Sequence, residues 1–426
     1  MTREKGPDLA KHPCFNAKMK GQFGRVHLPV APACNIKCNY CNRKYDCVNE
    51  SRPGVTSTVL SPTQALTYME KVLEAEPRIS VAGIAGPGDP FANAEETMET
   101  LRLIRNRFPE IILCLASNGL GINPYIEELA ELAVSHVTIT INAVDAAVSE
   151  NIYSWVRDGK VVHRGRSGAE LLLARQLAAV KKLKEHNITV KINSIIIPGV
   201  NDAHIREVAE RMKDLGADLL NCMALFPNPG TLFADIPQPD KETVAAIRNE
   251  AEQFLPQMRH CTRCRADAVG LLDHDRTEEF RGCLSACAKL PAPEAAARPY
   301  VAAASMEGIL VNQHLGEAER FFIFGKDDNG GYRIVEERTA PATGNGIRRW
   351  MQLARLLGDC QAVLVGGIGE KPSEILEKSG IKAMTMGGFI SEGLAAVYEG
   401  KPLGALKCRR SPCTKGSCSG AGGGCV

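Results

Sequence analysis

The sequence predicts an α/β protein in two parts: an open, partial (β/α)6 barrel followed by a smaller α/β domain. Between residues 26 and about 255, six short segments rich in Val, Ile and Leu alternate with amphipathic stretches of helical spacing. This alternation is typical of a parallel sheet with right-handed crossovers, and six units are fewer than the eight of a closed barrel. A second series of strand and helix patterns begins near residue 298, after a Pro/Ala-rich linker.

Each of the six predicted barrel strands is short and is closed by Gly, Pro or Asn. Their ranges are 25–32, 78–86, 111–119, 136–144, 188–199 and 217–227. Between them, residues 61–76 predict a helix with Ser61 as N-cap and Pro62 in the first turn, and residues 167–187 predict another. Chemistry in β/α folds collects at the carboxyl ends of the strands, so the residues that follow each strand are the first candidates for a site.

The division into domains follows the composition. We expect an N-terminal ligand-bearing segment over 1–25, the barrel over 26–260, and a Cys-containing connector and linker over 261–297. The second domain, 298–405, predicts a meander of three strands (300–316, 320–327 and 332–340), a helix (346–359), a buried strand (360–369) and a helix (373–380). Residues 406–426 are rich in Gly, Ser and Cys and predict a disordered tail.

The charge and hydropathy of the chain exclude several classes of protein. A formal net charge of +2 gives no electrostatic reason to expect nucleic acid or an anionic membrane as a partner. No run of 18 apolar residues predicts a membrane span, and the polar N-terminus lacks the apolar core of a signal peptide. We therefore expect a cytoplasmic protein. In a reducing compartment its 16 cysteines are thiols or metal ligands rather than disulfides.

Three cysteines, Cys34, Cys38 and Cys41, follow the first predicted strand with the spacing C-x3-C-x2-C. Three thiolates leave one corner of a [4Fe–4S] cluster without a protein ligand, whereas a tetrahedral zinc site, the alternative, needs a fourth. The pattern resembles the signature of the radical S-adenosylmethionine (SAM) superfamily. The resemblance implies that SAM chelates the open iron, that electron transfer releases a 5′-deoxyadenosyl radical, and that these three cysteines form the catalytic centre.

The same resemblance implies SAM contacts at the ends of later strands. The second strand ends in a Gly-Pro-Gly-Asp-Pro turn, where Gly86 and Gly88 allow close backbone approach and Asp89 replaces the more usual Glu. Tyr40 is expected near the adenine. The remaining candidates are Ser117, Asn118, Asn142 and Ile196. Each of these could also be a plain turn or a strand-end cap.

Further potential metal ligands lie outside the signature loop. They are His12, Cys14, Cys47, Glu50, Cys114, Cys222, Cys261 and Cys264. They suffice for two more clusters with about three ligands each, and incomplete ligation suits clusters that are substrates and must later leave. The alternatives are core packing for Cys114 and Cys222, a small zinc knot for the Cys261–Cys264 pair, and a solvated carboxylate for Glu50.

A more specific resemblance rests on ordered motifs from about residue 12 to 280. The motifs read "HPCF", "CNIKCNYCNRKYDCVNESRPGV", "AGPGDPFAN", "CLASNGL", "TITINAV" and "HCTRCRADAVGLL". Together they resemble the NifB family of nitrogenase cofactor maturases, and the following domain resembles the small NifX-type cofactor carrier. The resemblance implies fusion of two [4Fe–4S] clusters, with SAM-derived carbide and an extra sulfide, into an [8Fe–9S–C] precursor.

The family resemblance also implies ligand sets and partners. Cys47 would bind one substrate cluster with Cys261 and Cys264. Cys14 and Cys114 would bind the other together with His12. Cys222 is a weaker candidate, and Glu50 is a candidate ligand or proton acceptor. The implied partners are SAM, an iron–sulfur cluster donor protein, reduced ferredoxin or flavodoxin, and a nitrogenase cofactor scaffold or carrier protein.

Two other functions remain open from the residues alone. One is a different radical SAM enzyme, such as a peptide-modifying one, whose auxiliary clusters are permanent electron conduits. The other is a non-enzymatic iron–sulfur carrier or scaffold. In the carrier reading, the second domain and the Cys-rich tail store clusters. The family resemblance assigns no role to the helical pair Cys283 and Cys287 or to the cysteines of the tail.

Overall fold

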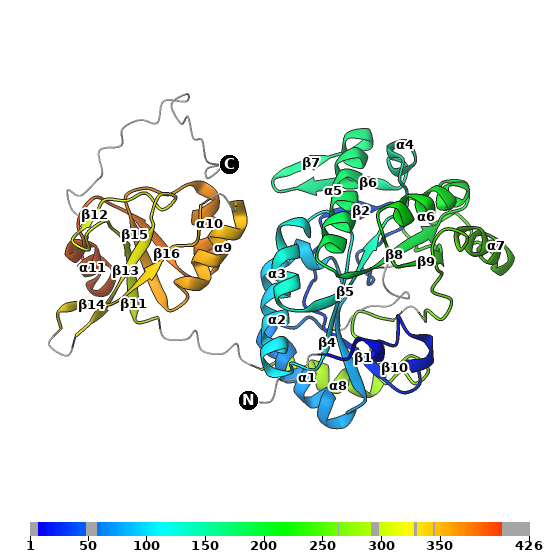
Figure 1. The fold of residues 1–426 in the computed structure, drawn as a ribbon, viewed down its shortest axis with the longest axis horizontal. Coiled ribbons are helices and arrows are strands. Elements are labelled where there is room, and N and C mark those ends of the chain that lie inside the picture. Colours follow the sequence, from blue (N-terminus) through cyan, green and yellow to red (C-terminus); the bar gives the residue numbers. More distant parts are fainter. Residues whose placement is uncertain are drawn as a thin grey trace. The chain divides into compact units, whose positions relative to one another are not determined.

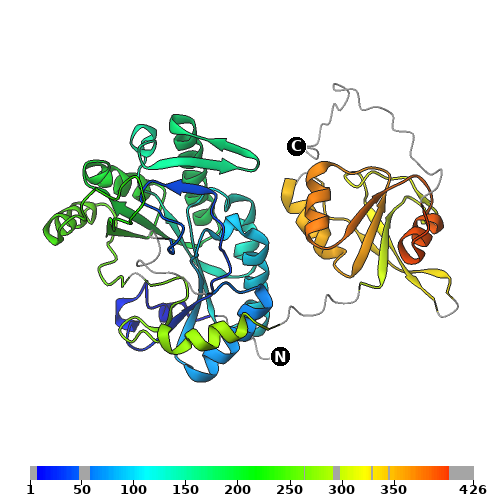
Figure 2. The same cartoon turned by 180° about the vertical axis from the view of Figure 1, so that it is seen from behind.

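The computed structural model describes residues 7–47, 58–262, 264–290, 298–327, 330–343 and 346–402. The chain divides near residue 292 into two compact units, which Figure 1 and Figure 2 show from opposite sides. Each unit is described by itself. The predicted ligand Glu50, the linker 291–297 and the predicted tail 406–426 lie outside the described residues.

The first unit is built on a seven-stranded sheet with the order β10-β1-β3-β4-β5-β8-β9. Its strands are β1 (Gly24–His27), β3 (Ile79–Ile84), β4 (Ile112–Ser117), β5 (Val134–Thr140), β8 (Thr189–Ile196), β9 (Leu219–Ala224) and β10 (Val269–Leu271). The first six are parallel and correspond to the six predicted strands, and the sheet curls with helices along its outer face (Figure 1). The predicted partial barrel is therefore confirmed.

The helices of the first unit cover the outer face of this sheet. They are α1 (Pro62–Ala75), α2 (Ala94–Arg107), α3 (Ile126–Glu131), α4 (Ala146–Ser149), α5 (Gly165–Glu185), α6 (Ile205–Asp214), α7 (Lys241–Ala251) and α8 (Thr277–Cys287). Short 3-10 helices are η1 (Leu9–Lys11), η2 (Ala17–Met19), η3 (Pro90–Ala92), η4 (Asn123–Tyr125) and η5 (Asp202–His204). α1 begins as predicted, because Ser61 and Gln64 each accept the other's backbone N–H in a capping box.

The connector belongs to the first unit as far as residue 290. Its strand β10 pairs antiparallel with β1, with Arg25 opposite Gly270, and its helix α8 packs against α1. The sequence predicted a connector here and no seventh strand. A three-residue strand carries too little period-2 pattern to be distinguished from a loop.

A second, three-stranded sheet was also not predicted. It has the order β2-β6-β7, with β2 (Ile36–Cys38), β6 (Tyr153–Asp158) and β7 (Val161–His163). Strand β2 lies inside the cysteine signature, and Ile36 and Cys38 pair with Val156 and Tyr153. The signature loop is thereby fixed to a hairpin more than 100 residues later in the chain.

The second unit has a five-stranded sheet with the order β14-β13-β11-β15-β16. The strands are β11 (Tyr300–Ala304), β13 (Arg320–Lys326), β14 (Tyr332–Thr339), β15 (Cys360–Val365) and β16 (Lys382–Thr385), and a separate pair joins β12 (Leu310–Val311) to β17 (Gly388–Phe389). Helices α9 (Gly346–Leu356) and α10 (Glu370–Lys378) pack on one face and α11 (Ile390–Glu399) on the other. The predicted meander is β11, β13 and β14, whereas the predicted strand 300–316 is split between two sheets.

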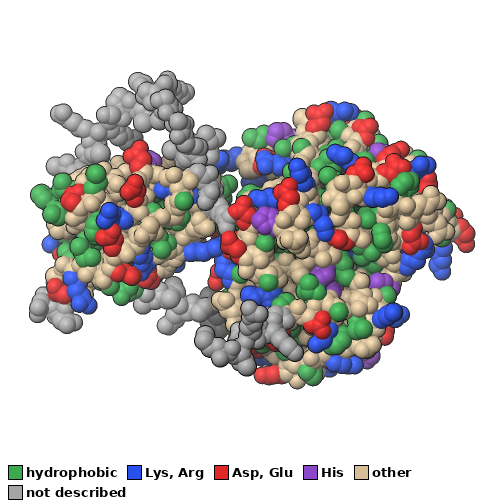
Figure 3. Space-filling model, in the orientation of Figure 1, with side chains coloured by type: hydrophobic (Ala, Val, Ile, Leu, Met, Phe, Trp, Pro, Cys, Tyr) green, Lys and Arg blue, Asp and Glu red, His purple; other side chains and the backbone are tan. Residues whose placement is uncertain are grey.

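The surface carries charges of both signs. On the face of the first unit seen in Figure 3, acidic and basic side chains are interspersed. Within the described residues, no helix is both long and apolar enough to cross a membrane.

Candidate functional site

The inward faces of the barrel strands carry the polar and reactive side chains. Successive strand residues point to opposite faces of a sheet, and here the helix-facing positions are apolar, as in Val26 of β1 and Leu113 of β4. The alternate positions face the concave side, as in Arg25, Cys114 and Lys191. On every strand of the parallel sheet, one row of side chains thus faces a common interior.

The first hollow on the concave side surrounds the cysteine signature, and we call it the loop pocket. It measures about 370 Å³, counting its open mouth. Its lining includes Cys34, Cys38, Cys41, Arg43, Cys47, Gly88, Asp89, Ala116, Ser117, Asn118 and Thr140. The structure thus brings the signature together with the Gly-Pro-Gly-Asp-Pro turn and with the ends of β4 and β5.

Close backbone contact joins the signature loop to that turn. Gly88 N donates to Ala31 O at 2.6 Å, and Asp89 N donates to Ala33 O at 2.8 Å. A Cβ atom on Gly88 would lie 2.0 Å from Ala33 O, so glycine is required at this position. Gly86 lies at φ +131°, a conformation that also favours glycine.

Asp89 is fully buried and braces the loop pocket. Its Oδ1 accepts from Phe91 N at 2.9 Å, and its Oδ2 accepts from Asn118 N at 2.6 Å and from the Ser117 hydroxyl at 3.0 Å. Asn118 Nδ2 in turn donates to Asn35 Oδ1 at 2.6 Å. Burial raises the pKa of Asp89. Both carboxylate oxygens therefore hold the chain together, and a contact between Asp89 and SAM stays a prediction.

Tyr40 and Asn142, both predicted to bind SAM, contact each other behind the loop pocket. Asn142 Nδ2 donates to Tyr40 Oη at 2.7 Å and to Tyr153 Oη at 3.1 Å, and all three side chains are buried. The contact between Ile196 and SAM stays a prediction. Its side chain lies in the core between the sheet and the helices, so only its backbone can face the concave side.

A second hollow, which we call the inner cavity, lies deeper on the concave side and measures about 670 Å³, counting its mouth. Its lining includes His12, Cys14, Phe15, Arg25, His27, Cys114, Lys191, Asn193, Asn221, Met223, Cys261, Thr262 and Cys264. The four cysteines come from the N-terminal segment, from β4 and from the connector. Ala116 lines both hollows, so the two are neighbours.

The resemblance implied that Cys47 shares a cluster with Cys261 and Cys264, and this ligand set stays a prediction. Cys47 lines the loop pocket, whereas its expected partners Cys261 and Cys264 line the inner cavity. Burial, together with the nearby Cys264 and Cys114, raises the pKa of Cys14 to about 12. Cys14 therefore lies close enough to both of these thiols for them to influence it.

Cys222 is a correction. The sequence placed it on the barrel interior, but its neighbours Asn221 and Met223 line the inner cavity and Cys222 points the other way. It is 0% exposed in the core beneath the helices, where burial raises its pKa to about 12. A residue one position away from an inward-facing residue faces the opposite side of the sheet. Cys222 is core packing and not a cavity ligand.

His12 offers an unused nitrogen to the inner cavity. Its ring is 1% exposed and packs beside Phe15 and His136, with centroids 4.8 and 4.4 Å away. Nδ1 accepts from Cys14 N at 3.2 Å, while Nε2 is buried without a hydrogen-bond partner in the part of the chain that is described. Burial lowers the pKa of His12, which keeps the ring neutral. A neutral imidazole beside several thiols fits contact with an iron–sulfur guest.

The inner cavity is positively charged. Arg25 and Lys191 line it, and no Asp or Glu is among its described lining residues. His27 adds no charge, because burial and the nearby Arg25 lower its pKa to about 4. The sequence analysis missed these two cations, although a charged side chain inside a short buried strand is a readable signal.

No group of three His, Cys, Asp or Glu side chains in the described ranges is placed to share a single metal ion. In a cubane each thiolate binds a separate iron, so the predicted cluster ligands do not need such a group. The buried, thiol-lined loop pocket fits a cluster bound by Cys34, Cys38 and Cys41. Burial, with the negative charge of Asp89, raises the pKa of Cys34 to about 11, so cluster binding must displace its proton.

The fold and the cysteine loop define a radical SAM protein, since residues 28–212 match the Radical SAM superfamily. Residues 298–400 match a second family, described as dinitrogenase iron-molybdenum cofactor. The chain is similar to two proteins named FeMo cofactor biosynthesis protein NifB. It is 52% identical to that of Chlorobaculum tepidum over 98% of this chain and 99% of that protein, and 41% identical to that of Klebsiella pneumoniae over 92% and 90%. The chain therefore belongs to the NifB family, as the sequence motifs predicted.

Solved structures offer more distant likenesses. Streptococcus suis SuiB bound to S-adenosylmethionine aligns with a TM-score of 0.41 and 14% identity, covering 55% of this chain and 50% of that chain. This likeness is too distant to carry an argument.

Proposed function

We propose that the chain is a radical SAM enzyme of nitrogenase cofactor maturation. It fuses two [4Fe–4S] clusters, with a SAM-derived carbide and an extra sulfide, into an [8Fe–9S–C] precursor. The observation that carries the proposal is the pair of adjoining hollows. One holds the three-cysteine signature, the other holds four thiols and two cations, and both contact Ala116.

The loop pocket is the place where SAM is bound and cleaved. Cys34, Cys38 and Cys41 would hold the resident cluster, and SAM would bind the corner that has no protein ligand. When bound, the cluster and SAM supply a 5′-deoxyadenosyl radical. Asp89 and Asn118 keep the end of β4 against the signature loop, and Gly88 admits the close backbone approach on which the pocket depends.

The inner cavity holds the substrate clusters. Cys14, Cys114, Cys261 and Cys264 supply thiolates and His12 supplies a neutral nitrogen. Iron–sulfur clusters with thiolate ligands are anionic, and the excess of cations over acids favours such a guest. These ligands are too few to saturate two clusters, so the clusters stay free to fuse and depart. One SAM would donate its methyl group to a sulfide of a substrate cluster and leave as S-adenosylhomocysteine. A second SAM would supply the radical that removes one hydrogen atom from this methyl and leaves as 5′-deoxyadenosine. Loss of the two remaining hydrogens as protons and cleavage of the carbon–sulfur bond, with electrons from the substrate irons and the added reductant, would leave the carbide.

The other assignments belong to the same proposal. Cys47 and Glu50 are further ligand candidates, one at the loop pocket and the other outside the described residues. The second unit acts as the carrier-like domain. The cytoplasmic protein works with an iron–sulfur cluster donor, reduced ferredoxin or flavodoxin, and a nitrogenase cofactor scaffold or carrier protein. Domain limits of 26–260 and 298–405 remain predictions.

The proposal is tested by anaerobic reconstitution followed by addition of SAM and a reductant. We expect three cubanes before SAM, and afterwards one larger cluster with S-adenosylhomocysteine and 5′-deoxyadenosine as by-products. Cleavage of SAM with all three cubanes unchanged would instead identify a radical SAM enzyme with permanent auxiliary clusters. An absence of cleavage would identify an iron–sulfur carrier.

A further inference from the structure

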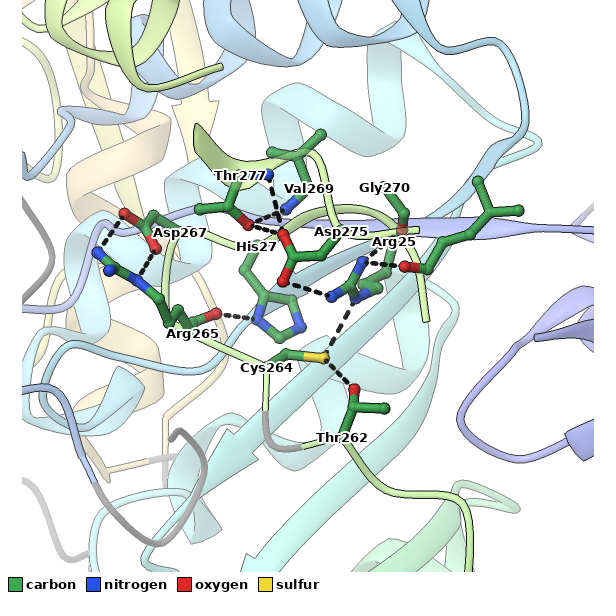
Figure 4. A network of polar contacts seen from close by, with 11 residues as sticks. Arg25, His27, Thr262, Cys264, Arg265, Asp267, Val269, Gly270, Asp275 and Thr277 are labelled. Atoms are coloured by element: carbon green, nitrogen blue, oxygen red, sulfur yellow. Dashed lines mark hydrogen bonds and ion pairs between the residues drawn. The ribbon is translucent and has the colours of Figure 1, made fainter. Parts of the chain in front are cut away.

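Arg25 is a buried cation that donates to a cysteine of the inner cavity. The residue is 1% exposed and lies on β1. Its Nη1 donates to Gly270 O at 2.5 Å and to Leu271 O at 3.1 Å, and its Nε donates to Cys264 Sγ at 3.2 Å (Figure 4). Three N–H···acceptor contacts fix the guanidinium plane, so the Nε–H is aimed at the sulfur before any guest arrives.

The charge of Arg25 is only partly compensated within the described protein. A guanidinium stays protonated, and a buried charge is costly unless it is paired. The carboxylate facing it belongs to Asp275, whose Oδ2 lies 4.0 Å from Nη2 and whose side chain is 31% exposed. The other side of the guanidinium meets Cys264, in a cavity whose described lining contains no acid. The arrangement calls for negative charge on the Cys264 sulfur.

We propose that Arg25 is a positioning residue that holds the Cys264 sulfur and raises the reduction potential of the iron–sulfur cluster bound there. The inference rests on the proposed function, because it assigns Cys264 to a substrate cluster. Hydrogen bonds to ligand sulfurs and nearby charge set the potentials of such clusters. A cation stabilises the more reduced and therefore more negative state, so the potential is higher with Arg25 than without it.

The planar arrangement of the guanidinium N–H groups also explains why this position has an arginine and not a lysine. Arg25 Nη1 donates twice to the backbone of β10, the strand that follows Cys264 along the chain. Arg25 therefore ties the connector to β1 at the level where Cys264 enters the cavity. A lysine keeps the charge but has no fixed, planar donor for the sulfur.

The test is a redox titration of the anaerobically reconstituted full chain, followed by electron paramagnetic resonance. The signal lost in Cys264→Ala identifies the relevant cluster, and the cluster that responds to SAM serves as an internal reference. Arg25→Gln is expected to lower the potential of the Cys264 cluster and to weaken its iron retention about 10- to 100-fold. Arg25→Lys is expected to restore part of the potential. The reference cluster is expected to keep its potential in both variants.

Asp275→Asn is the matched variant, and it is expected to shift the reduction potential in the opposite direction. It removes the carboxylate charge beside Arg25 but retains an oxygen for the Thr277 N–H. We expect the potential of the Cys264 cluster to rise, which a general loosening of the connector would not cause. The inference is overturned if folded Arg25 variants leave this potential unchanged, or if Asp275→Asn lowers it. If Arg25→Gln does not fold, the potentials measured in Arg25→Lys and Asp275→Asn decide whether the inference holds. Failure of the wild-type chain to assemble any cluster on Cys264 would overturn the proposed function as well.

Discussion

The loop pocket and the inner cavity are both lined by cysteines, but they are assembled in different ways. The three signature cysteines lie within eight residues, and one short strand pair fixes them. The four cysteines of the inner cavity come from three segments, which the seven-stranded sheet and the connector bring together. The ligands of the first hollow thus come from one loop that the barrel holds in place, whereas those of the second come together only when the connector is docked.

The two hollows also differ in charge. The loop pocket contains Asp89 and Arg43, one group of each sign. The inner cavity contains Arg25 and Lys191 and, in its described lining, no acid. SAM, which carries a sulfonium, an ammonium and a carboxylate, suits an environment with groups of both signs, and an anionic cluster suits the second.

The largest expected effect is on the loop pocket. Cys38→Ala removes one of three thiolates from a cluster that has no spare protein ligand. We expect release of 5′-deoxyadenosine to fall by more than about 100-fold, since even outer partners of metal ligands cost 10- to 100-fold. Chromatography of the reaction products measures this. Undiminished 5′-deoxyadenosine would refute the assignment of the signature.

Cys264→Ala should separate the two hollows. Removal of this thiol is expected to lower the iron content of the protein by the iron of one cubane and to stop formation of the larger cluster. Reductive cleavage of SAM should stay within about threefold of wild type, because the loop pocket is untouched. Iron analysis and a SAM assay on the same sample check both outcomes. Loss of SAM cleavage in a folded variant would mean that the hollows are not independent.

Cys222→Ala is the matched control within the barrel. This thiol is buried in the core and does not line the inner cavity. We expect full iron content and a loss of about 1–2 kcal/mol in the free energy of unfolding, the usual cost of a small core truncation. Urea denaturation of the metal-free protein measures the loss. A drop in iron would restore Cys222 as a ligand.

An effect of similar size, confined to stability, is expected for the docking of the connector. Glu76, whose side chain is 5% exposed, binds Arg78 at 2.7 Å and Arg276 of the connector at 3.1 Å. The hydrogen bonds from Arg78, with a further contribution from Arg276, lower the pKa of Glu76 from 4.5 to about 2. Glu76→Gln should lower the free energy of unfolding by about 1–2 kcal/mol at pH 7.

The pH dependence of this pair has a definite sign. A carboxylate with a lowered pKa stabilises the fold above pH 4.5 and loses that contribution as the pH falls toward 2. The difference between wild type and Glu76→Gln should therefore shrink below pH 4.5 in urea denaturation experiments. Glu279 also binds Arg276 but is 56% exposed, so Glu279→Gln should stay within about 0.5 kcal/mol. Equal effects of the two substitutions would contradict the conclusion that the buried Glu76 contributes more to the docking of the connector than the exposed Glu279.

Much of the barrel could be predicted from the sequence, because its strands are apolar runs closed by Gly, Pro or Asn and its helices have amphipathic spacing. Ser61 and Pro62 marked the start of α1, and the C-x3-C-x2-C spacing marked the signature loop. Very short strands such as β2 and β10 could not be predicted, since three residues give no usable periodicity.

The orientation of single side chains was harder to predict. Cys114 and Cys222 both lie within strands, yet only Cys114 faces the cavity. A shift of one residue in the strand register reverses the face to which a side chain points. Strand boundaries predicted from sequence carry an error larger than one residue. Arg25 illustrates the other difficulty, because its partners Cys264 and Gly270 lie far away along the chain.

Ala116 has a consequence for the spacing of the two guests. Its side chain is a single methyl group, 7% exposed, and both hollows contact this residue. Under the proposed function, the side chain that separates the sulfonium compound from the iron–sulfur cargo at this point is the smallest chiral one. A bulkier residue on that segment of β4 would take space from the two hollows and leave less room for the proposed guests.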